Sequence, residues 1–220
     1  MKVKAVLFDL DGTLVNSLCD LADSVNFALT EYGFPTHETE KFKYFIGDGM
    51  AKLIERVLPE DKRDDETLNE VLDTFMDRYR SHFADKTVAY GGIAELVRAL
   101  NKQGFKLAII SNKAQEMAVE VVDKVLSGLE FDIVCGKREG YPTKPDPTLT
   151  LEIIEELGLK SEECVFIGDS GMDMAVAKNA KVKSIGVLWG FREEKELRKN
   201  GADYIVSSPD EILGVINNKI

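Results

Sequence analysis

The pattern of apolar positions divides this chain into two regions of different character. From about residue 16 to residue 83, apolar residues recur at helical spacing, and no alternation typical of strands is present. After residue 84, short apolar runs alternate with amphipathic helical patterns, an order typical of parallel strands joined by helices. We therefore predict a small all-helical cap, residues 16–83, inserted into an α/β core formed by residues 1–15 and 84–220.

The core is predicted to be a Rossmann-like parallel sheet with helices on both faces. The mostly apolar run from Val3 to Phe8 indicates the first buried strand. Further strands are expected at residues 106–110, 131–134, 163–167, 183–188 and 204–206. Helices are expected between and after them, at residues 93–100, 119–126, 148–157, 172–179, 193–200 and 209–216.

Composition and charge narrow the class of protein. The 220 residues are 44% hydrophobic and 30% charged, which is ordinary for a globular domain, and the net charge of -11 argues against a nucleic-acid partner. No signal-type segment and no apolar run of transmembrane length is present, so we expect a cytoplasmic monomer or homodimer without a membrane partner. Cys19, Cys135 and Cys164 lack metal-ligand spacing and are predicted to be reduced thiols in the core.

Two carboxylates follow the first predicted strand directly. Asp9 and Asp11 are separated by one residue, and Gly12 and Thr13 end the strand, so both acids are expected at its carboxyl end. Carboxylates this close repel each other unless a cation lies between them or one binds a proton, and Mg²⁺ is the simplest such cation. Gly12 would let backbone N–H groups approach an anion, and Thr13 adds a hydroxyl. Taken alone, the same residues also fit a simple turn.

Three further polar groups follow later strands. Ser111 and Asn112 can donate hydrogen bonds to phosphate oxygens, although either also suits a helix N-cap. Lys144 lies in a loop with three prolines and is either a fixed charge for a phosphate or an ordinary solvated lysine. Asp169 and Asp173 form a second acidic pair, which a helix N-terminus would also favour. Four unrelated helix caps are a poor explanation for all of these polar groups together.

At these residues the chain resembles the haloacid dehalogenase superfamily of phosphotransferases. Its four motifs match in order, at residues 9–13, at Ser111, at Lys144 and at residues 168–173. The insertion after the first motif is similar to that of the helical-cap members. Residues 45–49, 140–145 and 189–191 most resemble the phosphoglycolate phosphatase-like branch.

The resemblance implies a role for each acid. Asp9 would attack phosphorus and form an aspartyl-phosphate, and Asp11 would act as acid and then base. Mg²⁺ would be held by Asp9, the backbone carbonyl of Asp11, and Asp169, while Asp173 would support the ligands. The implied activity is therefore the hydrolysis of a small phosphate ester that depends on Mg²⁺.

The remaining site residues would bind the phosphoryl group and select the substrate. Gly12 and Thr13, with Ser111, Asn112 and Lys144, are expected to contact the phosphate. The cap would close over the site, and its loop Gly47, Asp48 and Gly49 is expected to meet the leaving group, with Asp48 repelling a second anion.

Other activities stay open on the sequence. A sugar-phosphate mutase similar to β-phosphoglucomutase, or a pyrophosphatase, would use the same four motifs. A non-enzymatic binding protein is disfavoured, because a binder would not need both Asp9 and Asp11 beside Lys144 and Asp169.

Overall fold

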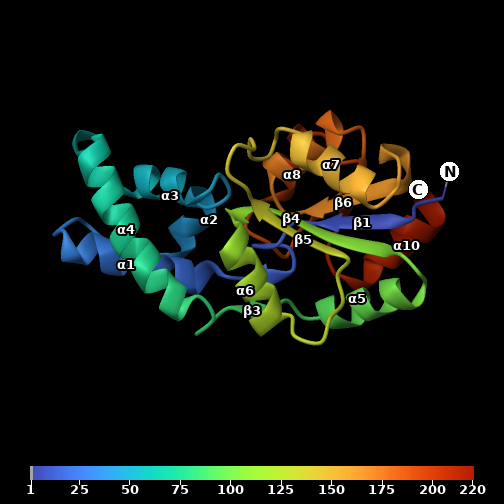
Figure 1. Cartoon of the computed structure of the whole chain (residues 1–220), viewed down its shortest axis with the longest axis horizontal. Helices are drawn as coiled ribbons and strands as arrows, with labels where there is room; N and C mark the ends of the chain where they lie inside the picture. Colours follow the sequence, from blue (N-terminus) through green and yellow to red (C-terminus); the bar gives the residue numbers. More distant parts are fainter. Residues whose placement is uncertain (1) are drawn as a thin grey trace.

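A computed structural model describes residues 2–220 of the chain. The molecule is elongated, with four helices at one end and the sheet with its covering helices at the other (Figure 1). The four helices at the first end all come from the segment expected to form the cap. Their bounds are α1 (Leu18–Glu31), α2 (Phe42–Phe45), α3 (Met50–Val57) and α4 (Asp65–His82).

The other end is built on a six-stranded parallel sheet, as predicted. The strand order is β5-β4-β1-β6-β7-β8, so β1 lies in the interior of the sheet between β4 and β6. The strands are β1 (Ala5–Phe8), β4 (Lys106–Ala114), β5 (Ile133–Lys137), β6 (Cys164–Gly168), β7 (Lys183–Val187) and β8 (Tyr204–Val206). Phe8 is paired with Ile109 and Ile167, so the carboxyl ends of the three neighbouring strands meet at one edge.

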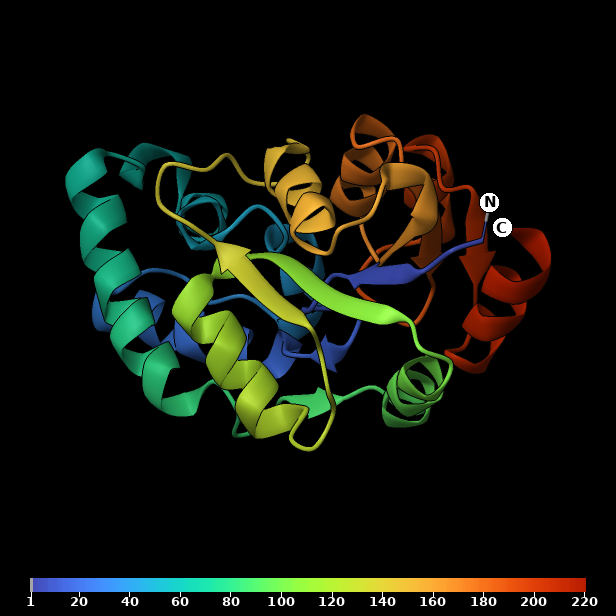
Figure 2. The ribbon, with the colours of Figure 1, turned by 45° about the vertical axis from the view of Figure 1, so that its right-hand side comes forward.

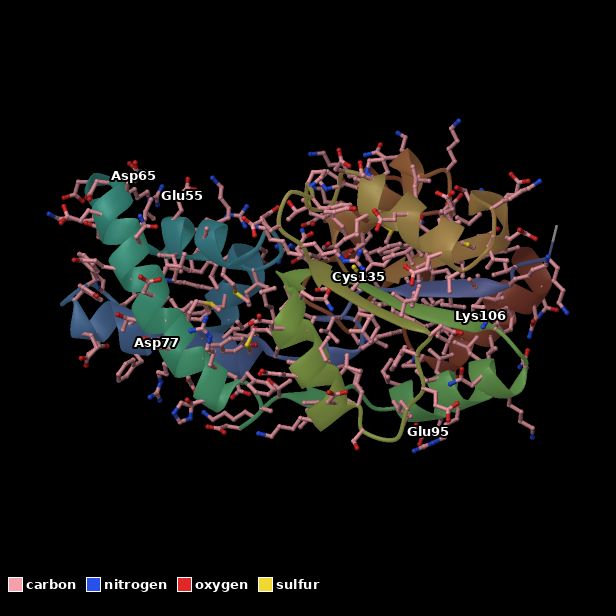
Figure 3. The ribbon with its side chains drawn as sticks, in the orientation of Figure 1. Glu55, Asp65, Asp77, Glu95, Lys106 and Cys135 are labelled. Carbon is pink, nitrogen blue, oxygen red and sulfur yellow. The ribbon has the colours of Figure 1, made fainter. Side chains whose placement is uncertain are left out.

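That edge faces the cap helices (Figure 1). Lys106, at the start of β4, lies at the opposite end of the sheet, far from the labelled cap residue Asp77 (Figure 3). Ligands bind at the carboxyl ends of strands in open α/β sheets, and here that edge is also the one next to the helical insertion. The residues at the carboxyl ends of β1, β4 and β6 therefore lie between the sheet and the cap helices.

Alternating residues of β1 pack into two separate apolar clusters. Val6 and Phe8 belong to the larger cluster, which includes residues of α5, α6, α10 and the cap, whereas Ala5 and Leu7 pack with residues of α7 and α8. Figure 2 shows helices on both sides of the sheet. The covering helices are α5 (Ile93–Lys102), α6 (Gln115–Val125), α7 (Thr148–Glu156), α8 (Gly171–Asn179), α9 (Glu194–Lys199) and α10 (Asp210–Lys219).

Three predictions are wrong in detail. The segment 16–83 is not entirely helical, because β2 (Val15–Asn16) pairs antiparallel with β3 (Val88–Ala89), and strands of two residues are too short to show alternation. The strand expected at residues 131–134 is instead Ile133–Lys137. Cys19 is exposed on α1, whereas Cys135 and Cys164 are buried. Within the described residues, no helix has the length and apolarity needed to cross a membrane.

A buried carboxylate ties the two chain crossings between the cap and the core together. Asp20 of α1 is 2% exposed and accepts hydrogen bonds from the backbone N–H groups of Lys86 and Thr87, at 3.0 and 2.8 Å. The Thr87 hydroxyl donates a further bond of 2.7 Å to the same carboxylate. The segment that leaves the cap is therefore fixed against the helix that begins it.

Replacing Asp20 by Asn places an NH₂ group against these donors. We expect Asp20→Asn to lower the free energy of unfolding by about 1–3 kcal/mol, because at least one buried N–H loses its acceptor. Urea unfolding measures the change, with Asp23→Asn as the matched control. Asp23 makes only an exposed ion pair with Lys86, so its replacement should change stability little. Equal effects of the two substitutions would contradict the role given to Asp20.

Candidate active site

Asp9 lies where β1 reaches the cap-facing edge of the sheet. Its backbone N–H donates a 2.9 Å bond to Ile167, so the parallel pairing with β6 extends to this residue. Its side chain is nearly buried, at 8% exposure of the residue. The chain then turns back at Gly12, which has a φ of 88° and whose N–H donates to the Val15 carbonyl at 2.8 Å. The turn leaves both Asp9 and Asp11 at the strand end.

Three buried carboxylates come together at this edge. Asp9, Asp169 and Asp173 each have an oxygen within 4.8 Å of the other two. Asp169 follows β6, and Asp173 lies in the first turn of α8, where it accepts bonds of 3.0 and 2.6 Å from the N–H and hydroxyl of Ser170. The N-cap of α8 therefore holds Asp173 in place beside the other two acids.

Lys144 is the cation inserted among these acids. Its Nζ lies 2.8 Å from Asp9 Oδ1 and 2.6 Å from Asp173 Oδ1, and its side chain is 6% exposed. Burial lowers the pKa of Lys144, but attraction to Asp173 and Asp9 outweighs burial and leaves the pKa above its usual value. Lys144 therefore stays charged, and the alternative of a solvated lysine is wrong.

One ammonium group does not balance three carboxylates. Burial raises the pKa of Asp9 to about 7, since the attraction of Lys144 is insufficient and Asp173 adds repulsion. The pKa of Asp169 is also raised, by burial first and then by the charges of Asp173 and Asp9. Without a further cation, the cluster gains from binding protons.

The donor set suits a hard divalent cation. All the available donors are oxygen atoms, which such cations prefer, and the cluster carries an excess of negative charge. Both oxygens of Asp173 already accept bonds from Lys144 or Ser170, whereas only Oδ1 of Asp9 accepts a side-chain bond. Asp9 is thus the better placed ligand, and Asp169 and the backbone carbonyl of Asp11 are the further ligands that the resemblance implies.

Gly12 and Thr13 support Asp169, and their expected contact with phosphate stays a prediction. The Gly12 N–H is already used within the turn, and a Cβ at Gly12 would lie 2.3 Å from Asp169 Oδ2. Thr13 is fully buried, and its hydroxyl donates to Asp169 Oδ1 at 3.3 Å. Both residues therefore bring the first turn into close contact with the second acidic motif.

Ser111 and Asn112 lie on β4, which continues to Ala114, so neither residue caps the next helix. Ser111 is 5% exposed and lines the pocket beside Asp9. The Asn112 amide donates to Gly47 O at 3.0 Å and to Lys144 O at 3.3 Å, and it accepts from the Lys144 N–H at 2.8 Å. Asn112 therefore joins the cap loop to the lysine loop, and its amide is committed to backbone groups rather than free for phosphate.

Asp11 is held by a group of residues that the sequence analysis did not identify. Lys113 Nζ lies 3.1 Å from Asp11 Oδ2 and 2.8 Å from the Tyr79 hydroxyl of α4, and the Ser17 hydroxyl donates to Asp11 Oδ1 at 2.5 Å. The Lys113 side chain is fully buried. Burial lowers its pKa, but the charge of Asp11 and the contact with Tyr79 outweigh burial and raise it overall.

A pocket lies over these residues, between the sheet edge and the cap. It encloses about 590 Å³ including its open mouth and is lined at its base by Asp9, Asp11, Lys113, Lys144 and Asp169. Its upper wall is apolar, formed by Leu21, Ile46, Met50, Leu53 and Phe191. Such a combination of an apolar wall and a few converging charges is typical of a small-molecule site.

Two of the three cap-loop residues expected at the site line the pocket. Gly47 and Gly49 line the pocket, but Asp48 does not, and its carboxylate pairs with Arg56 at 2.5 Å. The expected repulsion of a second anion by Asp48 is therefore corrected, because Arg56 neutralises the charge and draws it away from the pocket. In its place the structure puts Arg192, which sequence analysis missed, on the pocket wall.

Comparison with known proteins agrees with this geometry. A family model described as haloacid dehalogenase-like hydrolase matches residues 6–187. The chain is 32% identical to the phosphoglycolate phosphatase of Chromobacterium violaceum over 98% of this chain and 97% of that protein. It is also 32% identical to the phosphoglycolate phosphatase of Aquifex aeolicus, over 99% of each chain.

The fold comparison extends the likeness to solved structures. A crystal structure of a protein from Lactobacillus delbrueckii subsp. bulgaricus superposes with a TM-score of 0.92 and 32% identity, over 98% of this chain and 99% of that one. The arrangement of nearly the whole chain is thus shared with this solved structure. The chain belongs to the haloacid dehalogenase-like hydrolases, in a branch similar to phosphoglycolate phosphatases.

Proposed function

We propose that this protein is a Mg²⁺-dependent phosphatase that hydrolyses a small phosphorylated metabolite similar to phosphoglycolate. One observation carries the proposal: the Asp9 carboxylate is buried at the strand end, 2.8 Å from Lys144, with one oxygen free of any side-chain bond and Asp11 beside it. The names of the similar proteins supply the substrate class.

The first step transfers the phosphoryl group to Asp9. An oxygen of Asp9 attacks phosphorus, the ester P–O bond breaks, and the leaving oxygen takes a proton from Asp11. Lys113 and Ser17 hold the Asp11 carboxyl by both of its oxygens, so its orientation toward the leaving group is set before substrate binds. This preorganisation lowers the entropic cost of proton transfer.

The second step releases phosphate. Asp11 takes a proton from a water molecule, the water oxygen attacks phosphorus, and the bond to Asp9 breaks. Lys144 and Ser111 line the same pocket as Asp9, and they would offset the negative charge that the phosphoryl oxygens gain. A divalent cation held by Asp9 and Asp169 would neutralise the remaining charge of the phosphoryl group.

The apolar wall supports a hydrolase of a small ester over a sugar-phosphate mutase. The side chains of Leu21, Met50 and Leu53 cannot form hydrogen bonds. Sugar hydroxyls placed against them would therefore lose their hydrogen bonds to water without replacement. The decisive assay measures phosphate release from phosphoglycolate, pyrophosphate and a hexose phosphate. Isomerisation of the sugar without release of phosphate would identify a mutase instead, and preferential cleavage of pyrophosphate would identify a pyrophosphatase.

We expect Asp9→Asn to lower kcat by at least about 1,000-fold, because an amide is a poor nucleophile at the position where the covalent bond forms. Its melting temperature should stay close to that of the wild type or rise, since a buried charge is removed. Phosphate release and circular dichroism measure the two effects. Asp77→Asn, on the exposed face of α4, is the matched control and should leave kcat unchanged. A folded Asp9→Asn variant with near-normal turnover would exclude the nucleophile.

The contact between Lys113 and Asp11 predicts an effect on kcat. We expect Lys113→Met to lower kcat by about 10- to 100-fold with a smaller change in KM, because Asp11 keeps only Ser17 to orient it. Tyr79→Phe removes only the hydroxyl that Lys113 contacts and should cost less, about 2- to 5-fold. Lys86→Met, at an exposed ion pair, is the control. A change in KM alone would contradict the orientation of Asp11 by Lys113.

The raised pKa values predict how the cation stabilises the protein at different pH. The pKa values of Asp9 and Asp169 are 3.8 when unperturbed and higher in the folded state, about 7 for Asp9. The folded protein therefore holds protons that the unfolded chain has released, and the cation-free protein loses stability as pH rises from about 4 to about 7. Mg²⁺ should raise the melting temperature more at about pH 8 than at about pH 5.5, where protons compete with it.

Thermal unfolding in Mg²⁺ and in a chelator measures this difference. Asp169→Asn removes one proposed ligand, so the melting temperature of this variant should respond little to Mg²⁺ at either pH. If Mg²⁺ raises the melting temperature equally at both pH values, or still raises it in the variant, the cation binds elsewhere.

A further inference from the structure

The loop after β7 connects the acidic cluster to the cap. The Phe191 N–H donates to Asp169 Oδ2 at 2.7 Å, and the Trp189 indole N–H donates to the Thr13 carbonyl at 3.0 Å. A Cβ at Gly190 would lie 2.3 Å from the Cβ of Asp169, so the loop is closely packed against this residue. Arg192 follows directly and is therefore presented from a rigid segment at the pocket wall.

Arg192 has one nitrogen that the protein does not satisfy. Its Nη2 donates to the Ile46 carbonyl of the cap at 2.7 Å, and its Nε lies 3.4 Å from the Glu196 carboxylate. Within residues 2–220, its Nη1 is buried and finds no acceptor. Leaving a charged donor buried without a partner is unfavourable, and an acceptor supplied by a ligand would remove that penalty.

The other two cations of the pocket are already engaged. Lys144 lies between the Asp9 and Asp173 carboxylates, and Lys113 is bound by Asp11 and Tyr79. Among the described cations that line the pocket, Arg192 is thus the one with a side-chain nitrogen that has no hydrogen-bond partner. It also lies outside the group of residues that bind the phosphoryl, next to the apolar wall where the leaving group is expected.

We propose that Arg192 is the specificity residue that binds a carboxylate on the leaving group of the substrate. This inference rests on the proposed phosphatase function and narrows its substrates to short phosphorylated carboxylic acids. A carboxylate placed against Ile46, Met50 and Phe191 would lose its hydration and needs a charged partner, which a guanidinium nitrogen provides in a charge-assisted hydrogen bond. A neutral leaving group of equal length gains nothing from Arg192.

A purely structural role for Arg192 makes a different prediction. If the hydrogen bond from Arg192 to Ile46 only held the cap against the core, the loss of Arg192 would slow the turnover of every substrate alike. If Nη1 binds the substrate carboxylate, the loss of Arg192 lowers activity only on substrates that carry a carboxylate. A matched pair of substrates separates the two cases, because 2-phosphoglycolate and ethyl phosphate differ only by a carboxylate in place of a methyl group.

The test compares Arg192→Met, Arg192→Lys and the wild type on these two substrates. We expect Arg192→Met to lower kcat/KM for 2-phosphoglycolate by about 10- to 100-fold and to change that for ethyl phosphate by less than about threefold. Arg192→Lys keeps the charge and should recover part of the loss. Arg80→Met removes an arginine that makes an exposed ion pair with Asp77 on α4, and it should affect neither substrate selectively.

Binding of inert analogues decides the inference independently of turnover. Phosphonoacetate carries the carboxylate and ethylphosphonate lacks it, and calorimetry with Mg²⁺ present gives the affinity of each. Wild type should prefer phosphonoacetate, and Arg192→Met should lose that preference. Equal losses for both substrates, or a preference that survives in Arg192→Met, would overturn the inference. Absence of phosphate release from any monoester would overturn the proposed function, while the binding comparison would still decide the role of Arg192.

Discussion

The repulsion among three buried carboxylates is the constraint on which this structure depends. Asp9, Asp169 and Asp173 come from two strand ends and a helix N-terminus, and they stay together because Lys144 lies between two of them. The surrounding backbone is arranged to allow this approach, since Gly12, Gly168 and Gly190 each leave room that a Cβ would take from one of these acids. The site therefore carries an electrostatic cost that a bound divalent cation would relieve.

The three cationic side chains of the pocket differ in where their charges lie. Lys144 and Lys113 are paired with the acids to which we assign the chemistry, so their charges would act on the reacting centre. Arg192 lies beyond that centre and is held by the cap backbone and by Glu196. Chemistry that is common to many phosphate esters and recognition of one class of them can thus reside in separate residues of one small cavity.

The sequence predicts the sheet, most helices and the acids at strand ends because each depends on local spacing. Asp9, Asp169 and Lys144 follow strands or lie in a proline-rich loop, and such signals survive without knowledge of the fold. Asp48 and Thr13 contact Arg56 and Asp169, and these partners can be identified only in three dimensions. Lys113 lies two residues after Ser111 at the irregular end of β4, where alternation does not show which face a residue takes, and Tyr79 is hidden in the apolar stripe of α4.

The short ribbon of β2 and β3 has a consequence for how the two ends of the molecule can move. The chain crosses between core and cap twice, and both crossings are paired to each other at Val15–Ala89 and Asn16–Val88. A single crossing could twist freely about its bonds, but two strands joined by backbone hydrogen bonds resist twisting and yield mainly by bending together. Displacement of the helices would therefore follow one direction, toward or away from the mouth of the pocket, and would return the cap loop to the same register over Asn112 after each cycle.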